Sequence, residues 1–450
     1  MIIIKSEKDY LSVVNIFLYL WRVFIAFLMK VNVNSKSYKW EIIFLLWVAY
    51  FLNQADRQVF NTVLPHIQDY LGATDATMGL ISTCFNLFFA VTVPFAGYYA
   101  DRLSRSKIII FSVALFSVAT MFTGYASTIA LMILMRSIAT GVGEAIFGPT
   151  YPAIIAEYHD SKTRARAMSI HQTAYYIGVI ASGFLAGLIA DEIGWQYSFL
   201  IFGAAGVLFT FVLLLRLKDK SSVQPKVETA QSAKPSFFEA MAAIFKVPTA
   251  VCMIFGFTSL IFVLTGYLTW MPKCLMETFN HSSASAGFNS MFWTHAAAFV
   301  GVLVAGSLSD RLAASKGGGK NRLILQAGGL LLAAPCIALM GLSKEIWVVY
   351  AALAGFGFFR AFFDANTYSI LYDVISERYH SSASAVLQMF GFGMGSLAPL
   401  ILGLMSPKLG LSGGIATLGA IWVVAGVVLL VAKMFFFDKD AAKLRKQQQL

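Results

Sequence analysis

The sequence predicts an all-α integral membrane protein with twelve membrane-spanning helices. Of its 450 residues, 58% are hydrophobic and 13% are charged, whereas soluble domains contain about 25% charged residues. The mean hydropathy of +0.71 is also that of a membrane protein. Segments long and apolar enough to cross a bilayer as helices lie at 40–63, 77–99, 107–125, 128–155, 166–190, 197–216, 247–272, 285–308, 322–342, 346–373, 383–405 and 414–437.

A polar segment divides these spans into two sets of six. It includes KDKSSVQPKVETAQSAKPS, which is rich in Pro and Ser and poor in apolar residues, as flexible linkers are. We therefore expect an N-terminal six-helix bundle at 40–216, a linker at 217–246, a C-terminal six-helix bundle at 247–437 and a tail at 438–450.

The N-terminal extension, residues 1–39, fits this plan less simply. Residues 11–29 are apolar but interrupted by Arg22. They are compatible with a thirteenth span, a signal-like segment or an interfacial helix. A signal-like segment would stay uncleaved, because no small-residue cleavage site follows. Met29 begins a stretch typical of a cytoplasmic N-terminus, so our hypothesis is that translation starts there.

The distribution of Lys and Arg predicts the orientation of the spans. Alternate connections carry 25 of these residues, and the opposite connections carry three, Lys273, Lys344 and Lys408. Basic residues accumulate on the cytoplasmic side of membrane proteins, so the linker and both ends of the twelve-span core are predicted to be cytoplasmic. The net charge of +11 is thereby explained by topology and not by nucleic-acid binding. The compact plan suggests a bacterial inner membrane.

Two motifs recur in the two halves. GYYADRLSRSK at 97–107 follows the second span, and GSLSDRLAASK at 306–316 follows the eighth. YHDS at 158–161 and YHSS at 379–382 each lie between the fourth and fifth spans of their half. Many transporters consist of two repeated halves and bind their substrate at the interface between the repeats.

The first of these motifs matches the signature G-x-x-x-D-R-x-x-R-x-K, and residues 38–437 resemble the major facilitator superfamily. The resemblance implies two pseudo-symmetric six-helix bundles and charge contacts that hold one gate state. In the second copy Ala314 replaces the middle Arg, so its network should be weaker; alternatively, these charges only fix topology. The implied gating residues are Gly97, Asp101, Arg102, Arg105, Lys107, Gly306, Asp310 and Arg311.

Residues in the first, fourth and seventh spans indicate which groups within the superfamily the chain resembles. Asp56 and Arg57 in the first span and Glu144 in the fourth are similar to residues of Spinster-like transporters and of the anion:cation symporter group. WMP at 270–272 is similar to the symporter group. The usual Arg of the fourth span precedes that Glu by seven residues, but Arg136 precedes it by eight. Eight residues rotate the side chain by about 80° from the seven-residue position. Either a bulge absorbs the extra residue or Arg136 points elsewhere.

A polar stripe runs along the first span. Asn53, Asp56, Arg57 and Asn61 share one helix face. Lipid cannot satisfy such groups, so the stripe must face protein or water and is predicted to line a central cavity. Gln58 flanks the stripe, and other spans add Arg136, Thr140, Glu144, His171, Gln172, Tyr175, Arg360 and Asp364.

These residue types suggest roles. Glu144 and Asp56 are predicted to couple transport to protons, because a carboxylate whose charged neighbours change during a cycle can bind and release a proton. Arg57 is the predicted anion contact, because a guanidinium binds a carboxylate bidentately. The full set of predicted substrate-binding residues is Arg57, Asn53, Gln58, Arg136, Tyr151, His171, Gln172, Tyr175, Tyr267, Trp270, Trp293, Arg360 and Asp364.

Each role has a structural alternative. Asp56 with Arg57 could form a buried structural pair, and Arg360 with Asp364 could form an ion pair one helical turn apart. Glu144 could serve packing or gating instead, and His171 could be a hydrogen-bonded helix residue. The aromatic candidates could stack on a sugar ring or only pack against neighbouring helices. They are Tyr151, Tyr267, Trp270 and Trp293.

The leading functional prediction is a secondary active transporter that moves a small organic anion by proton coupling and alternating access. The symporter-group resemblance suggests a sugar acid such as a hexuronate, an aldonate or sialic acid. The alternative is a Spinster-like carrier of a lysolipid or another amphipathic lipid. We expect protons, a small-molecule substrate and the bilayer as partners, and a monomer.

Other classes fit poorly. The connections are too short for an extramembrane catalytic domain, and no P-loop, HExxH or GxSxG stands in a suitable context, which argues against an enzyme or a receptor. The four cysteines are scattered without a CxxC pair or a His/Cys cluster, so neither a metal nor a disulfide framework is expected. No cofactor is expected either.

Overall fold

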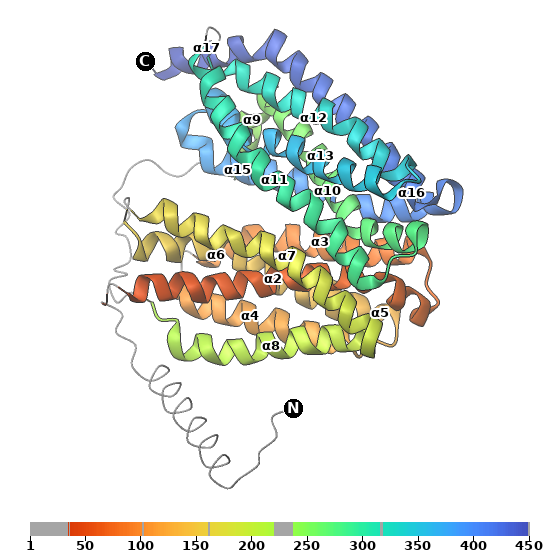
Figure 1. Ribbon diagram of the computed structural model, residues 1–450. Coiled ribbons are helices and arrows are strands. Elements are labelled where there is room, and N and C mark those ends of the chain that lie inside the picture. The colour runs from red at the N-terminus through yellow and green to blue at the C-terminus, as the bar shows by residue number, and fades with distance from the viewer. Residues whose placement is uncertain are drawn as a thin grey trace, which may run out of the picture.

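The protein is described by a computed structural model that covers residues 35, 37–100, 103–160, 163–219, 237–315 and 318–448. The described residues form helices and no strands (Figure 1), which confirms the all-α prediction. Most of the N-terminal extension, most of the linker and the predicted gating residues Asp101 and Arg102 lie outside the described residues.

The first six spans form one bundle, seen in the lower part of Figure 1. The fourth span consists of three consecutive elements: a short α-helix, a π-helical segment and a longer α-helix. The elements are α2 Tyr38–Leu71, α3 Asp75–Ala100, α4 Arg105–Thr123, α5 Ile129–Met132, η1 Ile133–Ala139, α6 Thr140–Tyr158, α7 Arg164–Ile193 and α8 Trp195–Arg216.

The last six spans form the second bundle. The tenth span is divided between two helices, and the eleventh and twelfth meet at a kink at Gly410, whose φ of 67° suits glycine. The elements are α9 Phe237–Phe245, α10 Pro248–Phe279, α11 Ser283–Ala314, α12 Lys320–Leu342, α13 Ile346–Asp364, α14 Thr367–Val374, η2 Glu377–Tyr379, α15 His380–Gly395, α16 Ala398–Val431, η3 Ala432–Phe436 and α17 Phe437–Gln448.

Helices lie at all twelve predicted positions. By length and hydropathy alone, ten described segments could span a membrane. The first span, α2, is not among them because its polar stripe lowers its hydropathy, and the last two spans are merged into Ser382–Lys446. The eleventh predicted span, 383–405, is interrupted where α15 ends at Gly395, and α16 begins at Ala398 with a proline in its first turn.

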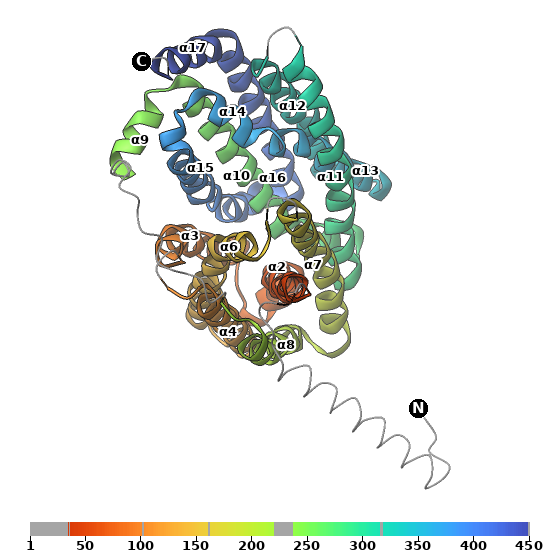
Figure 2. The same cartoon turned by 90° about the vertical axis from the view of Figure 1, so that its left-hand side faces the viewer.

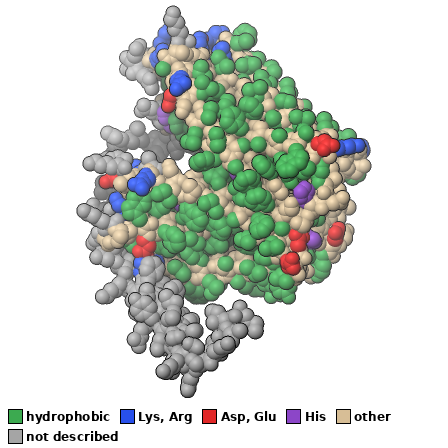
Figure 3. Space-filling view, in the orientation of Figure 1, with side chains coloured by type: hydrophobic (Ala, Val, Ile, Leu, Met, Phe, Trp, Pro, Cys, Tyr) green, Lys and Arg blue, Asp and Glu red, His purple; other side chains and the backbone are tan. Residues whose placement is uncertain are grey.

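The exterior is apolar where these helices would meet lipid. Figure 3 shows a broad hydrophobic surface across the middle of one face, with charged side chains near the margins that correspond to the helix ends. Such a band fits a helical bundle in a bilayer.

The two bundles meet closely at the end of the molecule where α2 ends. There α3 packs on α16 and α7 packs on α11 (Figures 1 and 2). A Cβ added to Gly79 would lie 2.3 Å from the carbonyl oxygen of Pro399, and one added to Gly287 would lie 2.2 Å from that of Gly183. These glycines permit backbone-to-backbone contact between the bundles, so this end is closed.

Candidate functional site

A cavity of 1140 Å³ lies between the bundles. Its walls come from α2, α3, η1, α6 and α7 on one side and from α10, α14 and α15 on the other. Of the residues predicted to bind substrate, those that line this cavity are Asn53, Arg57, Gln58, Arg136, Tyr151 and Tyr175.

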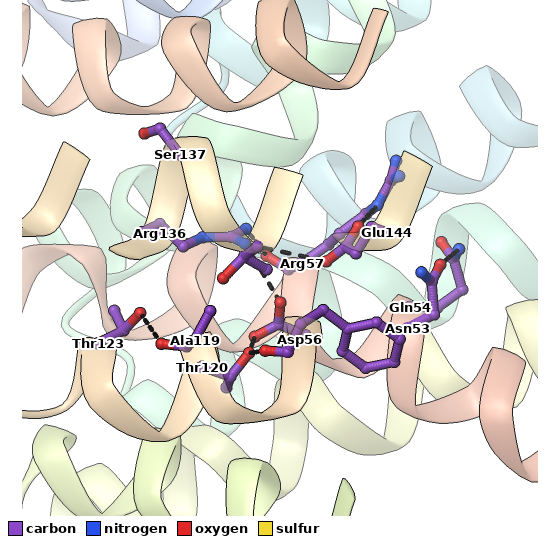
Figure 4. A network of polar contacts seen from close by, with 12 residues as sticks. Asn53, Gln54, Asp56, Arg57, Ala119, Thr120, Thr123, Arg136, Ser137 and Glu144 are labelled. Carbon is purple, nitrogen blue, oxygen red and sulfur yellow. Dashed lines mark hydrogen bonds and ion pairs between the residues drawn. The ribbon is translucent and has the colours of Figure 1, made fainter. Parts of the chain in front are cut away.

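The first ion pair of the site joins α2 to α6. Arg57 donates through Nε to Glu144 Oε2 (Figure 4). The Arg57 side chain is 27% exposed, whereas that of Glu144 is fully buried. Glu144 Oε1 accepts no hydrogen bond from the described residues. The pair therefore joins a partly exposed cation to a fully buried carboxylate within the cavity wall.

A second ion pair lies deeper. Arg136 Nη1 lies 3.3 Å from Asp56 Oδ2 and 4.0 Å from Glu144 Oε1. Thr120 Oγ1 donates to Asp56 Oδ1 at 2.6 Å. Arg136 Nη2 also lies 3.5 Å from the carbonyl oxygen of Arg57. The four charged residues thus form one connected network of two acids and two bases.

The π-helical segment η1 places Arg136 in this network. A π-helix adds a residue to a turn, and η1 lies between Met132 and Thr140. The additional residue offsets the rotation that the eight-residue spacing between Arg136 and Glu144 would otherwise produce. Of the two alternatives that the sequence leaves open, the bulge is the one observed.

Two phenylalanines of α3 support the arginines. The guanidinium carbon of Arg136 lies 4.1 Å from the ring centre of Phe85, and that of Arg57 lies 4.3 Å from the ring centre of Phe89. Cations are attracted to aromatic faces at such distances. The sequence analysis missed both residues; the neighbouring Asn86, a polar residue in an apolar span that also lines the cavity, was the available signal.

Other predicted residues of the N-terminal bundle lie behind the cavity wall or away from it. Asp56 is buried beneath the wall. His171 is fully buried and stacks on Tyr50 and Tyr151, with ring centres 4.8 and 4.1 Å away. Gln172 is exposed on α7.

Three predicted aromatic residues of the C-terminal bundle make their contacts within that bundle. The Tyr267 hydroxyl donates to the carbonyl of Ser290, and Trp270 Nε1 donates to that of Pro399 at 3.0 Å. Trp293 stacks on a tyrosine of α13, with ring centres 5.4 Å apart. None of these three lines the cavity.

Arg360 and Asp364 form an ion pair at 3.6 Å along α13, four residues apart. The arginine is buried. Neither residue is in the cavity lining, so their geometry matches the intrahelical alternative.

The described gating candidates lie at the other end of the molecule, where α2 begins. Arg105 Nη1 lies 3.3 Å from Glu157 Oε2 and thereby joins α4 to α6. Lys107 is exposed on α4, and Asp310 and Arg311 are exposed near the end of α11. The two further candidates, Gly97 and Gly306, lie within α3 and α11.

Comparison with known proteins identifies the class. The sequence model of the Major Facilitator Superfamily matches residues 46–399 and, in a second match, 275–449. The chain belongs to this superfamily of membrane transporters.

Several members resemble the chain at low identity. It is 23% identical over 408 residues to the hexuronate transporter of Bacillus subtilis, covering 88% of this chain and 96% of that protein. It is 23% identical over 445 residues to the probable galactarate/D-glucarate transporter GudP of the same organism, covering 92% and 96%. It is also 26% identical over 257 residues to protein spinster homolog 1 of Mus musculus, covering 56% of this chain and about half, 48%, of that protein.

A solved structure supports the fold. A bacterial homolog of the human lysosomal transporter Spinster, in an inward-facing and occupied conformation, superposes with a TM-score of 0.77. The identity is 21%, and the match covers 90% of this chain and 99% of that one. At this identity the likeness concerns the fold alone.

Proposed function

We propose that this protein is a secondary active transporter that carries a small organic acid, of the sugar-acid class, together with a proton. The observation that carries the proposal is the ion pair between Arg57 and Glu144, in which a cavity-exposed cation is held by a fully buried carboxylate. The similarity to transporters named for hexuronate and for galactarate and D-glucarate favours the same class of substrate.

The pair suggests how proton and anion are coupled. When Glu144 takes up a proton, Arg57 loses its partner and becomes free to bind a carboxylate in the cavity. When the anion leaves, Arg57 again favours the charged form of Glu144, and the proton is released. Binding of either ligand therefore promotes binding of the other, as thermodynamic linkage requires.

Alternating access would expose this site to the two sides in turn. The bundles are closed where α2 ends, and the distribution of Lys and Arg predicts that this is the non-cytoplasmic end. In this proposal the protein lies in the cell membrane with both ends of the core in the cytoplasm. One chain supplies both walls of the cavity, so a monomer suffices.

The test is proton movement in proteoliposomes on addition of sugar acids, with wild type beside Glu144→Gln. Glutamine mimics the protonated acid, so the variant should lose proton-coupled uptake but keep exchange of substrate for substrate. Glu345→Gln, at an exposed carboxylate outside the cavity lining, is the matched control and should behave as wild type. Proton-coupled uptake that survives in Glu144→Gln would refute the coupling role.

A second candidate, an amphipathic acid such as a lysolipid, is favoured by the opposite wall of the cavity. That wall contains the apolar residues Ile261, Leu264, Leu268, Met389 and Phe392, which could contact an acyl chain. Competition between lysophosphatidate and a sugar acid for uptake decides between the two. Inhibition by the lipid at concentrations where sugar acids have no effect would favour this candidate.

A further inference from the structure

The charge of the cavity wall limits what the substrate can carry. Among the described residues that line the cavity, the charged ones are Arg57, Arg136 and Glu144. Asp56 lies behind the wall and completes the network. With all four side chains charged, two positive and two negative charges balance.

Of the two arginines, one is committed to the protein. The side chain of Arg136 is 4% exposed and lies between Asp56 and Glu144, with the backbone of Arg57 as a third partner. Arg57, at 27% exposed, has Glu144 as its ion-pair partner. One proton on Glu144 therefore frees one guanidinium, that of Arg57, for a ligand.

The opposite wall, formed by α10, α14 and α15, contains polar side chains, and none of its described lining residues is charged. Ser384 Oγ and the Tyr372 hydroxyl lie 2.6 Å apart, and Gln388 Nε2 donates to a tyrosine hydroxyl at 3.4 Å. Thr265 and Thr269 also line this side. Such groups can hydrogen-bond the hydroxyls of a sugar. A second carboxylate placed here would lose water without gaining a cation, which is costly.

We infer that the substrate is a monocarboxylate, with one carboxylate at Arg57 and a neutral, hydroxylated remainder facing Ser384 and Gln388, and that it moves with one proton. The inference rests on the proposed function and narrows its substrate class. One proton and one monoanion together carry no net charge, so transport is electroneutral.

The first experiment compares two acids that differ at one end. D-gluconate has one carboxylate, and D-glucarate has a second in place of the terminal alcohol. We expect D-gluconate to inhibit proton-coupled uptake of labelled D-glucuronate at about tenfold or more lower concentration than D-glucarate, because only the diacid buries an unpaired charge. Equal or stronger inhibition by D-glucarate overturns the inference and leaves proton-coupled acid transport standing. If neither compound binds or moves protons, the proposed function fails as well.

The second readout is charge movement. The steady accumulation of D-glucuronate in wild-type proteoliposomes should follow the pH gradient and stay unchanged when valinomycin and potassium impose a membrane potential. A dependence of this accumulation on the potential would show net charge transfer and contradict the one-proton, one-carboxylate stoichiometry.

A third experiment uses a variant that should gain affinity for the diacid. Gln388→Arg supplies the opposite wall with a cation, so D-glucarate should become a better inhibitor relative to D-gluconate. Glu345→Arg adds a cation at an exposed position outside the cavity lining and should leave the preference unchanged. An unaltered preference in a folded Gln388→Arg protein would contradict the placement of the second end; if that variant does not fold, the wild-type comparison still decides.

Discussion

Arg136 and Asp56 form an ion pair that is almost wholly enclosed by protein, with side chains 4% and 3% exposed. Beside it, Arg57 reaches the cavity from the neighbouring position on the same helix as Asp56. Consecutive residues on an α-helix point about 100° apart, which lets α2 present one charge to the interior of its bundle and the next to the cavity. The network therefore combines an enclosed ion pair with the cavity-facing pair to which we assign proton coupling.

The structural role of Arg136 predicts a large loss of stability in Arg136→Met. Removing one partner of a buried ion pair typically costs about 3–5 kcal/mol, because the other charge stays buried without compensation. Here Asp56 would lose its cation and Glu144 would lose a nearby positive charge. Thermal unfolding of the purified protein in detergent, followed by tryptophan fluorescence, measures the effect as a lower Tm.

The double variant Arg136→Met/Asp56→Leu is the control for this mechanism. It removes both members of the pair, so its Tm should lie above that of Arg136→Met alone. If the Tm decreases of the single variants Arg136→Met and Asp56→Leu simply add in the double variant, the destabilisation by Arg136→Met arises from lost packing against Phe85 and not from the unpaired carboxylate.

Part of this site could be predicted from the sequence. Charged residues in an apolar span must face protein or water, so it followed from their positions alone that Asp56, Arg57 and Glu144 do not face lipid. Their pairing did not. That Arg57 binds Glu144 while Asp56 binds Arg136 depends on the relative rotation of α2 and α6 and on the π-helical turn of η1.

The contributions of α3 and α15 could be predicted less well. Phe85 and Phe89 stand in a span where phenylalanine is common, so periodicity does not separate a ring that holds a guanidinium from one that faces lipid. Gln388 lies in a span rich in small residues, where no periodic polar stripe distinguishes it. The all-helical fold was readable because hydropathy acts over whole spans, whereas these contacts depend on single side chains.

At the closed end of the molecule, an ion pair between Lys273 of α10 and Asp75 of α3 joins the two bundles. Lys273 is buried and also donates to Gln68 Oε1 at 2.6 Å. In Lys273→Met these links are lost and Asp75 keeps no cationic partner among the described residues, so the closed arrangement should be less populated. Thr62→Cys reports the change: Thr62 is fully buried beside Gly287, and its thiol should react faster with a membrane-impermeant maleimide.

The labelling is done in a background without the four native cysteines. Lys344→Met removes an exposed lysine on the same predicted side and should leave labelling unchanged. The exchange Asp75→Lys/Lys273→Asp restores opposite charges and should slow labelling again. Equal labelling in wild type and Lys273→Met would mean that the backbone contacts between the bundles keep this end closed without the ion pair.

His159, which follows α6, should make stability depend on pH. Burial lowers the pKa of His159, although its hydrogen bond to the carbonyl oxygen of Lys39 acts in the opposite direction. The unfolded chain therefore binds a proton more readily than the native protein, and stability falls as the pH drops through about 6.5. In His159→Gln the fall in Tm between about pH 8 and pH 5.5 should be smaller than in wild type. An identical fall in both proteins would assign the pH dependence to other groups.

Phe89 should act on substrate affinity through Arg57, whose guanidinium carbon lies 4.3 Å from its ring centre. Phe89→Leu keeps apolar bulk but removes the aromatic face, and a cation–π contact is worth roughly 0.5–2 kcal/mol. We expect KM for a sugar acid to rise by about two- to thirtyfold, with a smaller change in the maximal rate, while Phe89→Tyr keeps the ring and stays near wild type. Because Phe89 also contacts Phe392 across the cavity, with ring centres 5.8 Å apart, a lower Tm with unchanged KM would assign it to packing between the bundles instead.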